Sequence, residues 1–325
     1  MATLRHYYFQ VMKKWLIVTG AVLVLAVCSI FIFIPSKIVI TKITTANVTI
    51  TGALRFLSRE DKWEKWWHDE VGKPYEPGKP FIYNGASYQL THHENKAIGI
   101  EIEKGDLKLN SVMSLVSLKV DSIFILWECT IPAGSNPFKR LKRYREAFEI
   151  RNNMIAVLQN FNRFMAIPQN IYGLNITGQS TNDTMLLSAR YKNRNYPSTE
   201  DIYGYLHHVE ENIKKQKATV TGFPMLHIKR LPDSSYETQV ALPTSLWLKE
   251  NGEFFPRRMP KGYFLVANVK GGPHTIERAV EQMDYYISDY NKIVMAIPIQ
   301  YLITNRIEET DTSKWITRLC VPAME

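Results

Sequence analysis

YETQVALP (Tyr236–Pro243) and WITRLCVP (Trp315–Pro322) are two copies of one strand ending, and together they decide the fold of the second half of the chain. Aligned on the final proline, both copies give an aromatic residue, a threonine two places later, one polar residue and then small or apolar residues. The polar residue differs, since it is Gln239 in the first copy and Arg318 in the second. This repetition predicts an internal duplication.

The duplication extends over a unit of one strand, one helix and two further strands. The first unit covers residues 183–243 and the second covers residues 255–322. From the helix to the following strand, equivalent residues keep one constant spacing without a gap. The matched pairs are Ile202 and Ile276, Leu206 and Val280, Val209 and Met283, Ile213 and Ile287, and Pro224 and Pro298. We therefore expect two β-α-β-β units that pack about a pseudo-twofold axis, with a groove between them.

The doubled unit, residues 183–325, resembles the GyrI-like small-molecule-binding domain, which is also known as the AraC-type effector-binding domain. In that family an acidic residue commonly stands four places before the closing proline and faces the groove. The resemblance implies that this acid holds the cationic part of an amphipathic ligand, and that in some relatives it is a catalytic acid. The matching positions here are Gln239 and Arg318, and neither carries a carboxylate.

The substitution of both acids changes the ligand that we expect. Gln239 keeps hydrogen bonding without charge, whereas the guanidinium of Arg318 favours carboxylates or phosphates. Strand alternation places Glu237 on the same face as Gln239, as a displaced carboxylate. The alternatives are that Glu237 and Arg318 pair with each other or that Arg318 points to solvent. The candidate residues for binding a neutral or anionic amphipathic molecule are Glu237, Gln239, Arg318, Tyr236, Tyr263, Trp315 and Ile316.

No catalytic motif accompanies this groove. The chain has no G-x-S-x-G elbow, no glycine-rich phosphate loop and no H-E-x-x-H. The pairs His92–His93 and His207–His208 diverge on a strand or a helix, so we expect no metal site and assign no cofactor. The main hypothesis is a module that senses or sequesters a ligand. The alternatives are a hydrolase of small amphipathic substrates, with Glu237 as its acid or base, and a protein-interaction module of the envelope.

Residues 38–176 predict a separate α+β domain, because strands follow one another without crossover helices before one long helix. The segments DKWEKWW, ILWECTI, SNPFKR and IYGLNI resemble the START-like, polyketide-cyclase (SRPBCC) superfamily. The resemblance implies a curved sheet that grips a long helix around an apolar cavity. We expect Trp63, Trp66 and Trp67 to pack the short helices onto the sheet rather than to line that cavity.

The long helix of this domain is predicted over residues 138–165. Its predicted apolar face, from the spacing of three, four and seven, consists of Leu141, Tyr144, Phe148, Ile155, Leu158 and Phe161. The basic run FKRLKRYR (138–145) is expected to be a solvated helix face, with contact to phosphate head groups as the alternative.

An uncharged run, WLIVTGAVLVLAVCSIFIFI (15–34), predicts a membrane-spanning helix, since twenty residues at about 1.5 Å each span a bilayer of about 30 Å. A signal peptide is the alternative, but the run is long for one and has no A-x-A site. Basic residues before the run outnumber those after it by one. We therefore expect residues 1–14 in the cytoplasm and the soluble domains on the extracytoplasmic, periplasmic side.

The composition agrees with a folded, anchored protein. The chain of 325 residues is 45% hydrophobic and 22% charged, and its three cysteines are too few for a disulfide framework. The formal net charge of +9 suits an anionic partner. Without a zinc-finger spacing or a basic recognition helix, we expect no nucleic-acid partner.

Overall fold

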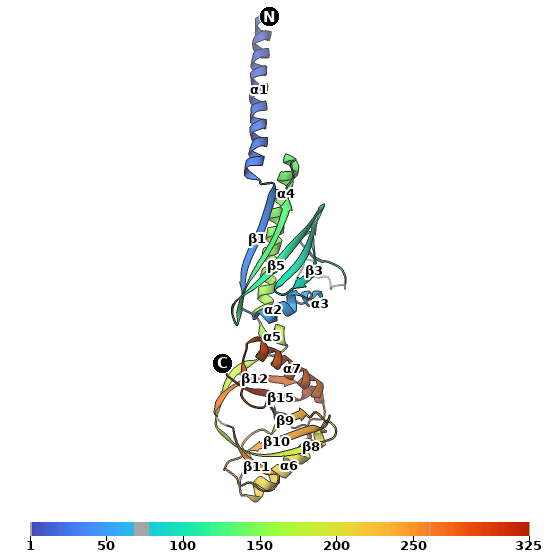
Figure 1. Cartoon of the computed structure of the whole chain (residues 1–325), viewed down its shortest axis with the longest axis vertical. Coiled ribbons are helices and arrows are strands. Elements are labelled where there is room, and N and C mark those ends of the chain that lie inside the picture. Colours follow the sequence, from blue (N-terminus) through green and yellow to red (C-terminus); the bar gives the residue numbers. More distant parts are fainter. Residues whose placement is uncertain (1, 68–77, 260, 325) are drawn as a thin grey trace. The chain divides into compact units, whose positions relative to one another are not determined.

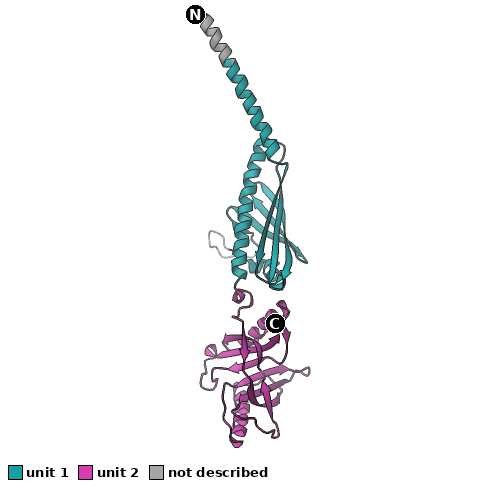
Figure 2. Cartoon of the chain, turned by 90° about the vertical axis from the view of Figure 1, so that its left-hand side faces the viewer, with its two compact units in different colours: residues 1–166 teal, residues 167–325 magenta. Residues whose placement is uncertain are grey.

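The computed structural model describes residues 2–67, 78–259 and 261–324, and the chain divides into two compact units. These are Met1–Ala166 and Ile167–Glu325, coloured separately in Figure 2. Each unit combines helices with an antiparallel sheet, which confirms the predicted α+β class. The sequence-based domain limits, 38–176 and 183–325, stay predictions.

The first unit begins with the long helix α1 (Ala2–Phe33) (Figure 1). Its segment Lys14–Phe33 has a mean hydropathy of 2.9, which makes it long and apolar enough to cross a membrane. A signal sequence near an N-terminus has the same length and composition. The helix ends before Pro35, which cannot donate a helical hydrogen bond.

The sheet of the first unit has six strands in the order β1-β6-β5-β4-β3-β2. The strands are β1 (Lys37–Ala46), β2 (Phe81–Tyr83), β3 (Ala86–Glu94), β4 (Ala97–Lys104), β5 (Leu107–Lys119) and β6 (Ser122–Pro132). The helices are α2 (Ile50–Leu57), α3 (Glu60–Trp63) and α4 (Pro137–Met165). Burial alternates along β6, so one face of the curled sheet is buried, and α4 packs on β1 and β6.

The predicted apolar face of α4 is wrong over the first half of the helix. Leu141, Tyr144 and Phe148 are exposed, whereas Arg143 and Glu146 are buried. The buried charges are tolerated because Arg143 donates to Glu146 (2.7 Å) and to Asp106 (2.6 Å). In the second half, Leu158 and Phe161 are buried as predicted.

The tryptophans near α3 pack as expected. Trp63 stacks on Trp67 at 5.2 Å, and Trp66 meets Phe161 of α4 edge-on at 5.0 Å. All three tryptophans are buried, with Trp63 fully inaccessible. They connect the short helices to the sheet and to α4.

The second unit is built on a sheet in the order β11-β8-β10-β9-β14-β15-β12-β7, with β13 paired to β15. The strands are β7 (Thr177–Thr181), β8 (Thr184–Asn193), β9 (Met225–Arg230), β10 (Tyr236–Pro243), β11 (Phe254–Met259), β12 (Gly262–Lys270), β13 (Ile293–Val294), β14 (Ile299–Leu302) and β15 (Ile316–Met324). The helices are α5 (Pro168–Tyr172), α6 (Thr199–Lys215), α7 (Pro273–Asp289) and the 3-10 turn η1 (Thr312–Lys314). The sheet therefore contains β8-β10-β9 and then, in reverse order, β14-β15-β12.

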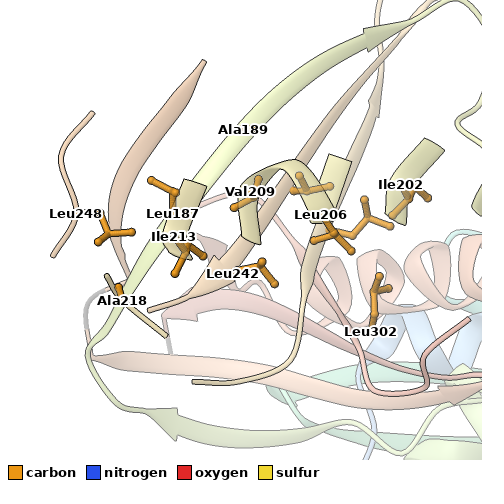
Figure 3. Close-up of a cluster of buried hydrophobic side chains, with 12 residues drawn as sticks. Leu187, Ala189, Ile202, Leu206, Val209, Ile213, Ala218, Leu242, Leu248 and Leu302 are labelled. Atoms are coloured by element: carbon orange, nitrogen blue, oxygen red, sulfur yellow. The ribbon is translucent and has the colours of Figure 1, made fainter. Parts of the chain in front are cut away.

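Helices α6 and α7 each cover part of one sheet face. Figure 3 shows Leu206 and Val209 of α6 near Leu187 and Leu242 of the strands. The core under α7 contains Ile276, Ala279, Met283 and Ile287 together with Leu265, Ala267, Leu319 and Val321. Because alternate strand residues point to opposite faces, Leu186, Ala241, Phe264 and Cys320 lie on the other face of the sheet.

Candidate functional site

The sheet face turned away from α6 and α7 carries a third apolar cluster. It consists of Leu186, Met225, Ala241, Met259, Phe264, Val266 and Cys320, with Ile299 and Tyr301 packed against it. These residues come from both halves of the sheet, from β8 to β11 on one side and from β12 to β15 on the other. The cluster therefore joins the two halves on this face.

A cavity of about 850 Å³, here called the main cavity, opens on this face. Its apolar wall includes Met225, Ala241, Met259 and Phe264, and the segment 295–297 lies along its edge. Ligand sites for small molecules have volumes of about 300–1,000 Å³ and mostly apolar walls. The main cavity thus has the size and the lining of a small-molecule site.

The polar part of the main cavity is cationic. Arg190, Arg257, Arg258 and Lys261 line it, and all four side chains are exposed at its rim. Arg258 Nε donates to both carboxylate oxygens of Asp183 at 2.9 Å. Within the described residues, the other three cations have no carboxylate partner, and the lining contains no Asp or Glu. The rim therefore favours negative charge.

His227 is a partly buried titratable group of this lining. Its Nδ1 lies 2.8 Å from the carbonyl oxygen of Pro298, and because a carbonyl only accepts, Nδ1 carries the proton. Burial lowers the pKa of His227 below its ordinary value, and this effect exceeds the opposing effects of the Pro298 carbonyl and of Glu237, which raise the pKa. At neutral pH the ring is therefore neutral, with Nε2 as a hydrogen-bond acceptor.

Two predicted site residues line the main cavity. Gln239 accepts a hydrogen bond from Arg190 Nε (3.3 Å), so the amide orients this rim guanidinium. Tyr263 also lies in the wall, with Lys292 Nζ 5.9 Å from the centre of its ring. The ring passes so close over Gly178 of β7 that a Cβ there would collide with it. Glycine at this position thus lets Tyr263 occupy the wall.

Arg318 lines a second pocket, of about 420 Å³, instead of the main cavity. Its Nε donates to Asn268 Oδ1 on the neighbouring strand (3.2 Å). Burial raises the pKa of Tyr301 to about 12 and that of Cys320 to about 11, so both stay protonated and apolar in character at neutral pH. Met225 lines both pockets and separates Arg318 from Gln239.

The other predicted residues line neither of these two pockets. Tyr236 meets Tyr196 edge-on at 5.5 Å, and Glu237 lies opposite Lys192 and Lys229 on the neighbouring strands. Trp315 is buried and donates from Nε1 to the carbonyl of Glu309 (2.7 Å). Ile316 is exposed. Residues 236 and 237 begin β10, whereas the cavity lies farther along this strand, and their roles in binding stay predictions.

Arg257 and Arg258 were not predicted from the sequence as residues of the cavity lining, although the sequence contains a signal for them. FFPRRM (254–259) holds two adjacent arginines between apolar residues, and it forms the edge strand β11, which was not predicted from the sequence. Within the described residues, no three His, Cys, Asp or Glu side chains gather in a way that could hold a metal ion. The described lining of the main cavity also lacks Ser, Thr and Cys, and its titratable groups other than the arginines are His227, Tyr263 and Lys261.

No family model matches the chain, and no curated protein matches it. It is similar to the solved EcmrR C-terminal domain at 13% identity, covering 47% of this chain and 98% of that one, with a TM-score of 0.41. It is similar to SAV2435 bound to tetraphenylphosphonium at 13% identity, covering 46% of this chain and 94% of that one, with a TM-score of 0.30. A START superfamily protein from Mycobacterium smegmatis matches at 12% identity, covering 38% of this chain and 97% of that one, with a TM-score of 0.28. Scores this low describe only a loose likeness.

Proposed function

We propose that this chain is a membrane-anchored protein whose main cavity binds a small amphipathic molecule that is neutral or anionic. The observation that carries the proposal is the lining, which combines apolar walls with exposed cations and, in its described part, no carboxylate. Apolar burial supplies affinity, and the few polar groups at the rim orient the ligand. The protein senses or sequesters this molecule.

The charge of the rim argues against a cationic ligand. A buried cation beside Arg190 and Arg257 finds no compensating carboxylate in the described lining, and an uncompensated buried charge is strongly unfavourable. An anionic group instead accepts hydrogen bonds from these guanidinium groups, each worth about 1.5–3 kcal/mol when the site excludes water. Gln239, at one of the family's acid positions, supports the same ligand class, whereas Arg318 lines the second pocket.

The lining also favours binding over hydrolysis. A hydrolase needs a nucleophile or an activated water next to a general base. His227 offers Nε2 as an acceptor, but the described lining places no hydroxyl, thiol or carboxylate nucleophile other than the Tyr263 phenol beside it. Glu237, the acid or base that the sequence offers, does not line the main cavity.

The proposal includes the anchor and the duplication. The segment Lys14–Phe33 is retained as a membrane span, and the soluble units face the periplasm. The two halves of the second unit, around β8-β10-β9 and β14-β15-β12, are repeats of one ancestral unit. A cavity between such repeats has one wall from each half.

Calorimetric titration of the full chain in nanodiscs tests the proposed ligand class. The ligands are naphthalene sulfonate, naphthol and a naphthyl trimethylammonium, with empty nanodiscs as the blank. We expect the sulfonate and the naphthol to bind more tightly than the cation. Arg190→Gln should weaken sulfonate binding about three- to tenfold, which corresponds to about 0.7–1.4 kcal/mol.

Lys192→Gln is the matched control, because Lys192 is also a cation of β8 but pairs with Asp233 (2.8 Å) outside the cavity. This variant should leave all three affinities unchanged. Tightest binding of the trimethylammonium ligand, unaffected by Arg190→Gln, would contradict the proposal.

A further inference from the structure

The first two turns of α4 expose apolar side chains next to cations. Phe138 is 79% exposed and Leu141 is 52% exposed, although large apolar residues are usually buried. Lys139 and Lys142 lie beside them on the same turns and are exposed as well. An apolar stripe bordered by lysines is typical of a helix at a membrane surface.

Backbone pairing places this part of α4 at the end of α1. Lys37, at the start of β1, pairs with Pro132 at the end of β6, and Ala133 N donates to Ser36 O (2.9 Å). Only a short turn separates Ala133 from Pro137, where α4 begins. Ser36 itself follows the last residue of α1 by three positions.

A side-chain contact fixes the depth of α4 more closely. The guanidinium of Arg140 lies 4.6 Å from the centre of the Phe31 ring (Figure 1 shows α4 beginning beside the end of α1). Phe31 belongs to the apolar segment that ends at Phe33, two residues or about 3 Å farther along the helix. If the segment spans a bilayer, Arg140 therefore lies at the level of the head groups, where its buried side chain packs on Phe31 and the neighbouring Lys139 is exposed.

We propose that the first two turns of α4 (137–144) lie in the headgroup layer of the bilayer that α1 crosses. Phe138 and Leu141 insert between the lipids, and Lys139 and Lys142 face the phosphates. Lys142 also contacts Asp106 (2.9 Å) and Arg140 is buried, so Lys139 carries the exposed charge that has no carboxylate partner among the described residues. The occupant of this surface is an anionic lipid surface, and the inference extends the proposed anchoring without using the ligand cavity.

Depth-dependent fluorescence quenching of the full chain in nanodiscs tests this placement. A polarity-sensitive label is attached to Phe138→Cys or Leu141→Cys in a Cys28→Ala background, because Cys129 and Cys320 are buried. The nanodiscs contain phosphatidylglycerol with lipids brominated on the acyl chains. We expect at least twofold quenching at positions 138 and 141.

Phe148→Cys is the matched control, since Phe148 is exposed on the same helix but lies seven residues, or about 10 Å, beyond Leu141. Its label should not be quenched. Native Cys28, labelled alone, should be quenched strongly because it lies within the span. Unquenched Cys28 would overturn the anchor, and this inference with it, while leaving the cavity proposal in place.

The charge requirement is tested in the same system. Lys139→Glu should at least halve the quenching at position 138 in phosphatidylglycerol and leave it unchanged in phosphatidylcholine. Arg145→Glu, in the next turn and 85% exposed, should have no effect. Equal quenching at 138, 141 and 148, or quenching at none of them while Cys28 is quenched, would overturn the inference. Protection of position 138 from aqueous quenchers without bromolipid quenching would indicate a protein partner instead, and would overturn it too.

Discussion

The imidazole of His227 lies near the carboxylate of Glu237 as well as the cations Lys229 and Arg190, and its Nδ1 is hydrogen-bonded to the carbonyl of Pro298 (2.8 Å). Burial lowers its pKa below the ordinary value of 6.5, so the unfolded chain takes up this proton at higher pH than the folded chain does. The contribution of His227 to the free energy of unfolding is therefore complete above about pH 6.5 and is lost as the pH falls through the lowered folded pKa. Protonation at acid pH adds one positive charge to the main cavity.

Binding of an anion should consequently strengthen as the pH falls. From pH 7.5 to 5, we expect naphthalene sulfonate to bind about three- to tenfold more tightly, while naphthol affinity stays level. Titration calorimetry at a series of pH values measures both ligands. His227→Gln should remove the pH dependence of the sulfonate. Loss of sulfonate affinity at acid pH in the native chain would show that the ring does not face the ligand.

Of the predicted site residues, Gln239 and Tyr263 line the main cavity, and their roles in binding stay predictions. Gln239 was found because it stands at a fixed distance from the closing proline, and it does line the main cavity. Three different strands carry Arg190, His227 and Arg257. No local sequence pattern predicts that these strands lie close together in the sheet. Their proximity depends on the pairing of the sheet, which a single sequence does not specify.

The segment between α7 and β14 borders the main cavity with exposed apolar residues. Met295 is 57% exposed, and Ile297 is 45% exposed. A ligand in the cavity would cover part of this apolar surface, at about 25 cal/mol for each Å² removed from water. The segment therefore acts as an apolar edge for the ligand's hydrocarbon part.

Met295→Ser should weaken binding of both naphthol and naphthalene sulfonate about three- to tenfold, because less apolar surface is buried. Trp247→Ser is a matched control, since Trp247 is also 57% exposed but lies outside the cavity lining. The control should bind both ligands normally. Equal losses in the two variants, measured by calorimetry, would indicate a general effect on folding rather than a contact with the ligand.

Helix α4 shows where periodicity fails to predict burial. A spacing of three and four identified a helix over residues 138–165, and the helix is present. The same spacing also fits a second face, which carries Arg143 and Glu146, and the structure buries that face in the first half. Pairing of Arg143 with Asp106 of another element makes this possible, and such pairing is not visible in the helix sequence.

At the scale of the whole molecule, the boundary between the two compact units lies between Ala166 and Ile167, before α5. Tyr172 of α5 is fully buried, donates to Asp289 of α7 (2.9 Å) and meets Tyr286 edge-on at 5.2 Å. Strand β7 pairs with β12, so residues 167–183 complete the core under α7. The sequence predicts a folded fragment that starts near Thr184, and such a fragment lacks these contacts.

A fragment of residues 167–325 should therefore be more stable than one of residues 184–325. We expect a difference of at least about 3 kcal/mol in the free energy of unfolding, comparable to the loss of a buried aromatic side chain. Urea denaturation followed by circular dichroism measures it. Tyr172→Phe in the longer fragment isolates the hydrogen bond to Asp289 and should cost about 1 kcal/mol. Equal stability of the two fragments would place the boundary at residue 183, as the sequence alone suggests.

The order of strands and helices was thus predictable, because alternation and helical spacing are local properties of the chain. The strands that were missed are short or lie at edges, as in β7 and β13. The burial of Arg143 and the meeting of the rim cations depend on contacts between distant segments. Those contacts follow from pairing and packing, which local patterns leave open.

The pairing of β9 with β14 joins the two halves of the sheet through Leu226 with Gln300 and Met225 with Tyr301. Each half has its own helix and its own core, and this short junction and the apolar cluster on the cavity side hold the two halves together. The main cavity is also lined by Met225, Leu226 and Ile299 of this junction. A molecule bound there therefore contacts both halves and stabilises their association. From the proposed function, we expect a chain with an empty cavity to open here more often and to be cleaved faster by proteases than a chain with bound ligand.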